Sequence, residues 1–309
     1  AVVVLSQAAD GLARSASHWL VLDGGTATAS GSPRELIRSA ELARTGTVIQ
    51  TVTHTTAARA ANTAPVIQPP VIQAPAAVQD AGPDPAPPAP VLELDGVGFS
   101  FPVAGGPLGE PLLRELDLTV RPGEIVAVTG RNGAGKSTLL RHFNGLLRPA
   151  AGEVRVSGTS IAGLPVGRVA GSVGLLFQLP RDQLFERTVL REVSFGLRRL
   201  VGKDATARAY EALEAVGLSG DAGVHPAELP ASKQRLLALA TVLARQPAVL
   251  ALDEPTVGLD RHGLEFLHRA IEDCAARGAA VVLVTHELSY ARATAHRVLK
   301  LSGGGLQES

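Results

Sequence analysis

The stretch IVAVTGRNGAGKST, residues 125–138, joins a short apolar run to a glycine-rich turn and then to the start of a helical pattern. Its central part, Gly130 to Ser137, fits the pattern G-x-x-x-x-G-K-[ST]. In this context the glycines let backbone N–H groups turn inward, and the N-terminus of the following helix adds positive potential, so that phosphate groups are bound. The stretch therefore predicts an α/β fold in which a buried strand, a phosphate-binding loop and a helix follow one another.

The side chains of this loop have the chemistry that ATP with Mg²⁺ requires. Lys136 can reach the β- and γ-phosphates, and the hydroxyl of Ser137 can bind Mg²⁺. A glycine-rich turn without a function is the alternative, and the Lys-Ser pair and the flanking elements argue against it. The candidate nucleotide-binding residues are Gly130, Asn132, Gly133, Ala134, Gly135, Lys136, Ser137 and Thr138.

A second apolar run, VLALDE at residues 249–254, ends in two neighbouring carboxylates. Ligands of open α/β sheets bind at the carboxyl ends of the strands, so Asp253 and Glu254 are expected beside the phosphate-binding loop. One carboxylate can hold Mg²⁺ while its neighbour polarises the attacking water. We assign the first role to Asp253 and the second to Glu254; solvated acids that only cap a strand are the alternative.

Strand-like and helix-like segments alternate along the rest of the chain, which favours an α/β fold with a largely parallel sheet. Residues 116–120 alternate apolar and polar side chains, as a strand with one buried face does. Short apolar runs, typical of strands covered on both faces, lie at residues 125–128, 249–252 and 281–284. Helical spacing is present at residues 188–199, 205–216 and 263–276.

With these motifs in this order, residues 91–305 resemble the ATP-binding cassette (ABC) family of P-loop NTPases. The resemblance implies ATP hydrolysis by a nucleotide-binding domain with a mostly parallel sheet, an antiparallel β subdomain and a helical subdomain. It also implies that Phe101 stacks on adenine, although a core phenylalanine is the alternative. The implied catalytic residues are Glu254, His286 and Gln178; the implied Mg²⁺ site uses Ser137, Gln178 and Asp253; and Gly258, Leu259 and Asp260 resemble the D-loop.

The segment FQLPRDQLF, residues 177–185, is more specific than a general Q-loop. It is similar to the energy-coupling factor branch, the ATPases of importers for vitamins and for cobalt or nickel ions. This resemblance implies that Asp182, Gln183, Leu184 and Phe185 dock a transmembrane coupling subunit, which acts with a substrate-binding membrane subunit. The protein is then expected to lie peripherally at the cytoplasmic face of the plasma membrane.

One motif departs from the family pattern. Where the family has Leu-Ser-Gly-Gly-Gln before a long helix, this chain has Leu229, Pro230, Ala231, Ser232 and Lys233. A proline is comfortable at a helix start, but it supplies neither the hydroxyl nor the N–H that the family directs at a γ-phosphate. We expect the fold to tolerate this degenerate signature while the phosphate contact is lost.

The N-terminal part repeats the C-terminal end. A constant offset of 279 residues places Val2 to Gln7 on Val281 to His286, and Leu20, Leu22, Gly24 and Gly25 on Leu299, Leu301, Gly303 and Gly304. Chance similarity between strand-helix-strand segments is the alternative. We interpret residues 1–46 as the tail of a first cassette whose remainder lies upstream of residue 1, residues 47–90 as a Pro/Ala-rich linker, and residues 91–309 as a complete nucleotide-binding domain.

These departures converge on one composite site, because family members associate head to tail. The degenerate signature would face the first cassette's site, which has Gln7 where the switch histidine is expected. We therefore expect a tandem ATPase with one hydrolytic site and one ATP-holding site. Two alternatives remain: a soluble, non-transport ABC ATPase, and a nucleotide-gated regulatory module with little turnover.

Composition excludes several other classes. Lys plus Arg equals Asp plus Glu at 29 each, and no basic stretch is interleaved with aromatic residues, which argues against a nucleic-acid partner. The longest apolar runs fall far short of the roughly 20 residues that span a bilayer. Cys274 is the only cysteine, so an internal disulfide is impossible.

Overall fold

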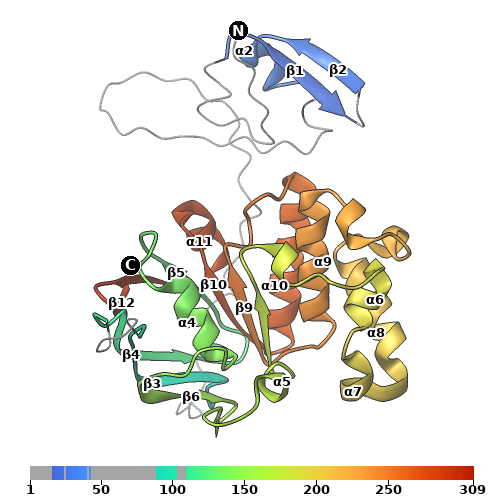
Figure 1. The fold of residues 1–309 in the computed structure, drawn as a ribbon. Helices are drawn as coiled ribbons and strands as arrows, with labels where there is room; N and C mark the ends of the chain where they lie inside the picture. Colours follow the sequence, from blue (N-terminus) through green and yellow to red (C-terminus); the bar gives the residue numbers. More distant parts are fainter. Residues whose placement is uncertain (1–15, 24–25, 40–41, 43–87, 103–108) are drawn as a thin grey trace, which may run out of the picture. The chain divides into compact units, whose positions relative to one another are not determined.

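The computed structural model describes residues 16–23, 26–39, 42, 88–102 and 109–309 (Figure 1). They fall into an N-terminal piece and a C-terminal piece, each of which has a hydrophobic core of its own. Val2 to Gln7, Gly24, Gly25 and most of the proposed linker lie outside the described residues.

The C-terminal piece is built on a six-stranded sheet with the order β12-β11-β5-β10-β9-β8, in which only β12 runs antiparallel to its neighbour. Every residue of β5, β9 and β10 is buried, which confirms the strands expected from the three apolar runs. The strands are β5 (Ile125–Thr129), β8 (Val173–Leu176), β9 (Val249–Asp253), β10 (Ala280–Val284), β11 (Arg297–Ser302) and β12 (Gly305–Glu308). Helices α4 (Lys136–Phe143), α9 (Ala231–Leu243) and α11 (Leu288–Thr294) pack on this sheet, and α10 (Arg261–Ala276) connects β9 to β10.

A second, antiparallel sheet has the order β4-β3-β6-β7. In β4 the apolar residues Leu116, Leu118 and Val120 are buried while Asp117 and Thr119 are exposed, as the alternating pattern predicted. The buried face joins Phe143 of α4 and the strands of the parallel sheet in one core. Its strands are β3 (Leu92–Phe99), β4 (Leu113–Val120), β6 (Ala151–Val156) and β7 (Thr159–Ser160).

A group of helices lies across the parallel sheet from β3, β4 and β6 (Figure 1). Helical spacing at residues 188–199 suggested one segment, but the structure has two short helices there. Gly196 adopts φ +75° between them, a left-handed conformation that ends the first helix. The helices of this group are α6 (Val189–Ser194), α7 (Leu197–Val201) and α8 (Ala205–Ala215). The short helix α5 (Val166–Val169) lies outside it, and its Val169 joins the core of the two sheets. There are 3-10 turns at Pro180–Asp182, Gly202–Asp204, Ser219–Asp221 and Pro226–Glu228. Among the described residues, no helix combines the length and the hydropathy needed to cross a membrane.

The N-terminal piece contains an antiparallel hairpin of β1 (Trp19–Asp23) and β2 (Thr26–Gly31), followed by α2 (Pro33–Leu36). Around its turn Leu22 pairs with Ala27, and Asp23 pairs with Thr26. At the offset of 279 residues these pairs correspond to Leu301↔Leu306 and Ser302↔Gly305 of β11 and β12. The two hairpins therefore share their turn position and the register beside it.

Gly174 in β8 gives a direct test of how β8 packs against α9. A Cβ at this position would lie 2.3 Å from Val242 Cγ1 and 3.0 Å from Pro247 Cγ. We expect Gly174→Ala to lower the free energy of unfolding by about 1–3 kcal/mol, the usual cost of overpacking a core. Chemical denaturation measures the change. The matched control is Gly167→Ala in α5, where a Cβ meets no atom within 4 Å; equal stability losses in both variants would contradict the packing of β8 against α9.

Candidate functional site

The glycine-rich loop runs from the end of β5 to the start of α4 and depends on close backbone approach. A Cβ on Gly130 would lie 2.6 Å from the carbonyl oxygen of Leu301, so no side chain fits there. Gly135 has φ +100° directly before the first residue of α4, a conformation that favours glycine. The loop therefore connects the carboxyl end of β5 to the N-terminus of α4.

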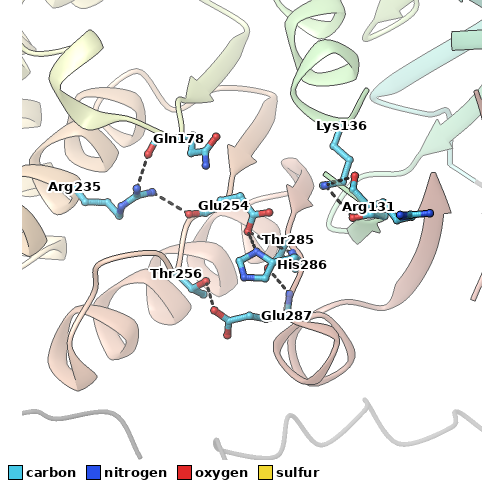
Figure 2. Close-up of polar contacts among 10 residues, drawn as sticks. Arg131, Lys136, Gln178, Arg235, Glu254, Thr256, Thr285, His286 and Glu287 are labelled. Atoms are coloured by element: carbon cyan, nitrogen blue, oxygen red, sulfur yellow. Dashed lines mark hydrogen bonds and ion pairs between the residues drawn. The ribbon is translucent and has the colours of Figure 1, made fainter. Parts of the chain in front are cut away.

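Lys136, the first residue of α4, folds back over the loop (Figure 2). Its Nζ donates to the carbonyl oxygens of Gly130 at 3.0 Å and Arg131 at 3.2 Å, and the side chain is buried. These bonds use two of the three ammonium donors. A cation held in this way can meet a phosphate oxygen that enters the loop.

Asp253 is the last residue of β9 and is buried at the same edge of the sheet. Burial raises the pKa of its carboxyl group, and a hydrogen bond with the Ser137 side chain opposes this effect. Among the described residues, its Oδ1 atom has no hydrogen-bond partner. A buried, unsatisfied carboxylate oxygen beside a hydroxyl has the ligand chemistry that Mg²⁺ prefers, so these two residues fit the ion. The described residues contain no cluster of three or more His, Cys, Asp or Glu that could hold a metal ion.

Glu254 and His286 meet where β9 and β10 end (Figure 2). The Oε2 atom of Glu254 lies 2.9 Å from Nδ1 of His286 and accepts the His286 backbone N–H at 3.3 Å. Glu254 is buried, whereas the imidazole is 57% exposed. The backbone of Glu254 has φ +47°, which is uncommon for a residue with a side chain. The structure thus brings together two of the residues expected to act in catalysis.

Gln178 follows β8 and is exposed, and its carbonyl oxygen accepts a hydrogen bond from Nη2 of Arg235 at 2.5 Å. The same guanidinium donates through Nη1 to the carbonyl oxygen of Glu254 at 3.0 Å. Sequence reasoning missed Arg235. The available signal was a charged residue directly before the apolar residues 236–240 of a helix. Thr256 and Glu287 lie within the motifs noted in the sequence, but their pairing was not predicted: the Thr256 hydroxyl donates to the Glu287 carboxylate at 3.2 Å.

The remaining predicted residues lie in several places. Phe101 is 47% exposed and packs edge to face on Phe99, with ring centroids 4.9 Å apart. Asp260, after Gly258 and the buried Leu259, accepts the Gly263 N–H at the start of α10. In the degenerate signature, Pro230 precedes the first turn of α9, and Lys233 Nζ lies 2.8 Å from the Asp221 carboxylate.

The segment expected to dock a membrane subunit divides into an anchor and an exposed tip. The Gln183 side chain donates to the Leu175 carbonyl and accepts from the Phe177 N–H, both at 2.9 Å, so its amide extends β8. Phe185 is 65% exposed and packs edge to face on Phe195, which is 51% exposed. The buried carboxylate of Glu192 accepts the Phe185 N–H at 2.8 Å and holds this tip in place. Asp182 is exposed and Leu184 half-buried.

Comparison with known proteins identifies the family to which the chain is similar. The profile described as "ABC transporter" matches residues 113–257. A putative ABC transporter ATP-binding protein of Pyrococcus furiosus is 39% identical over 219 residues, which cover 70% of this chain and 82% of that protein. The energy-coupling factor transporter ATP-binding protein EcfA2 of Streptococcus sanguinis is 39% identical, with 71% of this chain and 80% of that protein covered.

The chain spans about two fifths of the length of two Methanosarcina relatives, 38% of a putative ABC transporter ATP-binding protein from M. acetivorans and 40% of one from M. mazei. Among solved structures, cbiO1 from Clostridium perfringens, part of the transporter complex cbiONQ, is similar with a TM-score of 0.63 and 27% identity. That match covers 71% of this chain and 87% of cbiO1. A dimeric, ADP- and phosphate-bound cassette, MJ0796, has the same TM-score of 0.63 with 26% identity, and 70% and 98% of the two chains are covered.

Replacement of Lys136 tests the loop. We expect Lys136→Ala to weaken ATP binding roughly tenfold to hundredfold, since a hydrogen bond to a charged group contributes about 1.5–3 kcal/mol. Isothermal titration calorimetry measures the affinity. Lys203→Ala, which removes an exposed lysine from a 3-10 turn, is the control and should leave binding unchanged. Equal affinities for the wild type and Lys136→Ala would rule out this loop as the phosphate site.

Proposed function

This chain belongs to the ABC transporter family, and we propose that it hydrolyses ATP to power a membrane importer of the energy-coupling factor type. The observation that carries the proposal is the convergence of three features at one edge of the sheet. These are the glycine loop with its buried lysine, an unsatisfied buried carboxylate beside a serine hydroxyl, and a glutamate paired with a histidine.

In the proposed reaction, the loop and Lys136 bind the phosphates of ATP, and Glu254 orients the water that attacks the γ-phosphorus. His286 hydrogen-bonds the same carboxylate, so it limits the rotamers that Glu254 can adopt. Ser137 and Asp253 would hold Mg²⁺, which offsets phosphate charge when bound. Phe101 would stack on adenine, and its side chain is exposed enough for such a contact.

The importer branch is supported by two independent observations. Relatives named energy-coupling factor transporter ATP-binding proteins, among them EcfA of Methanothermobacter thermautotrophicus, are 37% identical to this chain. In addition, the exposed aromatic pair Phe185 and Phe195 lies just after the Q-loop, where an apolar partner surface could cover it. We propose that this pair docks a transmembrane coupling subunit, which places the protein peripherally at a membrane.

The docking proposal predicts that Leu184→Ser combined with Phe185→Ser separates the protein from its membrane partner. Loss of a central aromatic anchor costs about 2 kcal/mol or more, equivalent to about a thirtyfold loss of affinity. Co-purification from detergent extracts measures the effect, and ATP affinity should stay at the wild-type value. Leu146→Ser, at an exposed apolar residue after α4, is the control. Normal co-purification of the double variant would favour the non-transport ABC ATPase instead.

We further propose that the chain is the C-terminal part of a tandem two-cassette protein. The hairpin β1–β2 supports this, because it reproduces the turn and adjacent register of β11–β12 at the offset found in the sequence. In the C-terminal piece, the hairpin β11–β12 lies beside the strand that leads to the phosphate loop, with β11 parallel to β5. The equivalent place for β1 is beside the phosphate-loop strand of a first cassette. Gln7, in the place of its switch histidine, lies outside the described residues.

The degenerate signature supports an asymmetric pair of sites. Pro230 is the N-cap residue of α9 and has no N–H to donate, and the Lys233 ammonium pairs with Asp221. The same observation favours the second candidate function, a nucleotide-gated module with little turnover. The two functions differ in whether Glu254 supports steady hydrolysis.

For the tandem protein with both cassettes, we predict that Glu254→Gln lowers the rate of phosphate release by about 10² to 10³, the usual cost of losing a preorganised catalytic group. ATP should still bind. A normal rate in this variant would contradict the assignment of Glu254, and a wild type without turnover would favour the nucleotide-gated module.

The same assay tests whether the two ATP sites differ in activity. Residues 229–233 are replaced by the family's signature, Leu-Ser-Gly-Gly-Gln. The 309-residue chain alone can only pair its intact site with a poor signature, so repair should raise its low rate, yet leave the tandem protein nearly unchanged. Lys233→Gln alone is the control, since it breaks only the partly exposed pair with Asp221. Equal acceleration of both proteins would overturn the model with one working site.

A further inference from the structure

Arg235 is a buried cation in the second turn of α9, with 5% of its surface exposed. Burial lowers the pKa of its guanidinium, and the nearby carboxylates of Asp253 and Glu254 oppose that effect. A buried charge is expensive unless hydrogen bonds and opposite charges compensate it. Its hydrogen bonds go to two main-chain carbonyl oxygens, those of Gln178 and Glu254.

These two carbonyls occupy equivalent places beyond the ends of neighbouring strands. Parallel pairing of β8 with β9 ends at Leu176↔Leu252, and Gln178 and Glu254 each lie two residues further along. Where the hydrogen bonds between β8 and β9 stop, the guanidinium therefore bridges the two backbone segments that follow these strands (Figure 2). Arginine suits this task because its planar fork presents several N–H donors in fixed directions.

The Glu254 backbone needs such support. Its φ of +47° is a sparsely populated conformation for a residue with a side chain, at a cost on the order of 1–3 kcal/mol. Several contacts hold it: its N–H donates to Val284 O at 2.9 Å, its carbonyl accepts from Arg235 at 3.0 Å and from the Val257 N–H at 3.3 Å, and its carboxylate pairs with His286. Of these partners of the Glu254 backbone, Arg235 is the side chain, and among the described residues its loss would leave the carbonyl with only the longer bond from Val257.

We infer that Arg235 is a positioning residue for ATP hydrolysis, which fixes the Glu254 backbone against the Gln178 backbone. The inference rests on the proposed function and deepens it. Its hydrogen bonds go to the Glu254 and Gln178 carbonyls, so we expect it to act through the placement of Glu254 on the attack of water rather than on the binding of ATP. Through Gln178 it also ties the catalytic carboxylate to the segment that leads to Gln183 and Phe185.

Phosphate release and ATP affinity of Arg235→Lys and Arg235→Gln, measured in the tandem protein, test this role. We expect Arg235→Gln to lower kcat about tenfold to hundredfold, as misplacement of a catalytic group commonly does, while KM for ATP and the calorimetric Kd stay within twofold. Arg235→Lys should recover part of kcat, because an ammonium keeps the charge but lacks the planar fork. Thermal unfolding identifies any variant that is not folded, in which case Arg235→Lys carries the test.

Arg245→Lys is the matched control. It changes a partly buried arginine two residues past the end of the same helix, about 15 Å from Arg235 by helical rise. Its kcat and KM should equal those of the wild type. An unchanged kcat in both Arg235 variants, or a loss of ATP affinity that matches the loss of rate, would overturn the inference. A wild type without Glu254-dependent phosphate release would instead overturn the proposed function and this inference together.

Discussion

Close packing of the main chain at Gly130 is the constraint on which the site depends. The glycine faces the carbonyl of Leu301 in β11, and β5, which leads into it, is buried between β10 and β11. The loop therefore starts directly against β11, and Lys136 enters α4, which packs against β9. The phosphate cradle and the carboxylates thus follow strands of one sheet, at the same edge.

Electrostatic balance at this edge comes from a small number of buried groups. Lys136 and Arg235 bring positive charge, and Asp253 and Glu254 bring negative charge. The bonds of both cations go to main-chain carbonyls, and Oδ1 of Asp253 lacks a partner among the described residues. These groups are of the kind that a divalent ion and phosphate oxygens bind, which is the arrangement that the proposed ATP hydrolysis requires.

The departures from the family pattern fall outside this centre. Pro230 and Lys233 lie at the start of α9. Arg235, in the second turn of the same helix, donates to the Glu254 carbonyl at the intact site. A single helix therefore carries both a degenerate motif and a well-placed cation. This combination is consistent with the proposed asymmetry, in which α9 serves its own cassette fully and the neighbouring cassette poorly.

The sequence by itself determined the loop, the three apolar strands and the acid pair, because each lies in contiguous residues whose local chemistry favours one structure strongly. It also indicated the hairpin repeat at 279 residues, since a shared turn preserves spacing. Only the tertiary structure decided that Arg235 bridges Gln178 and Glu254, that the Gln183 amide completes the end of β8, and that Gly196 divides a helical pattern into α6 and α7. Those features depend on partners distant in the chain or on a backbone angle that spacing does not encode, and for this reason no local pattern predicted them.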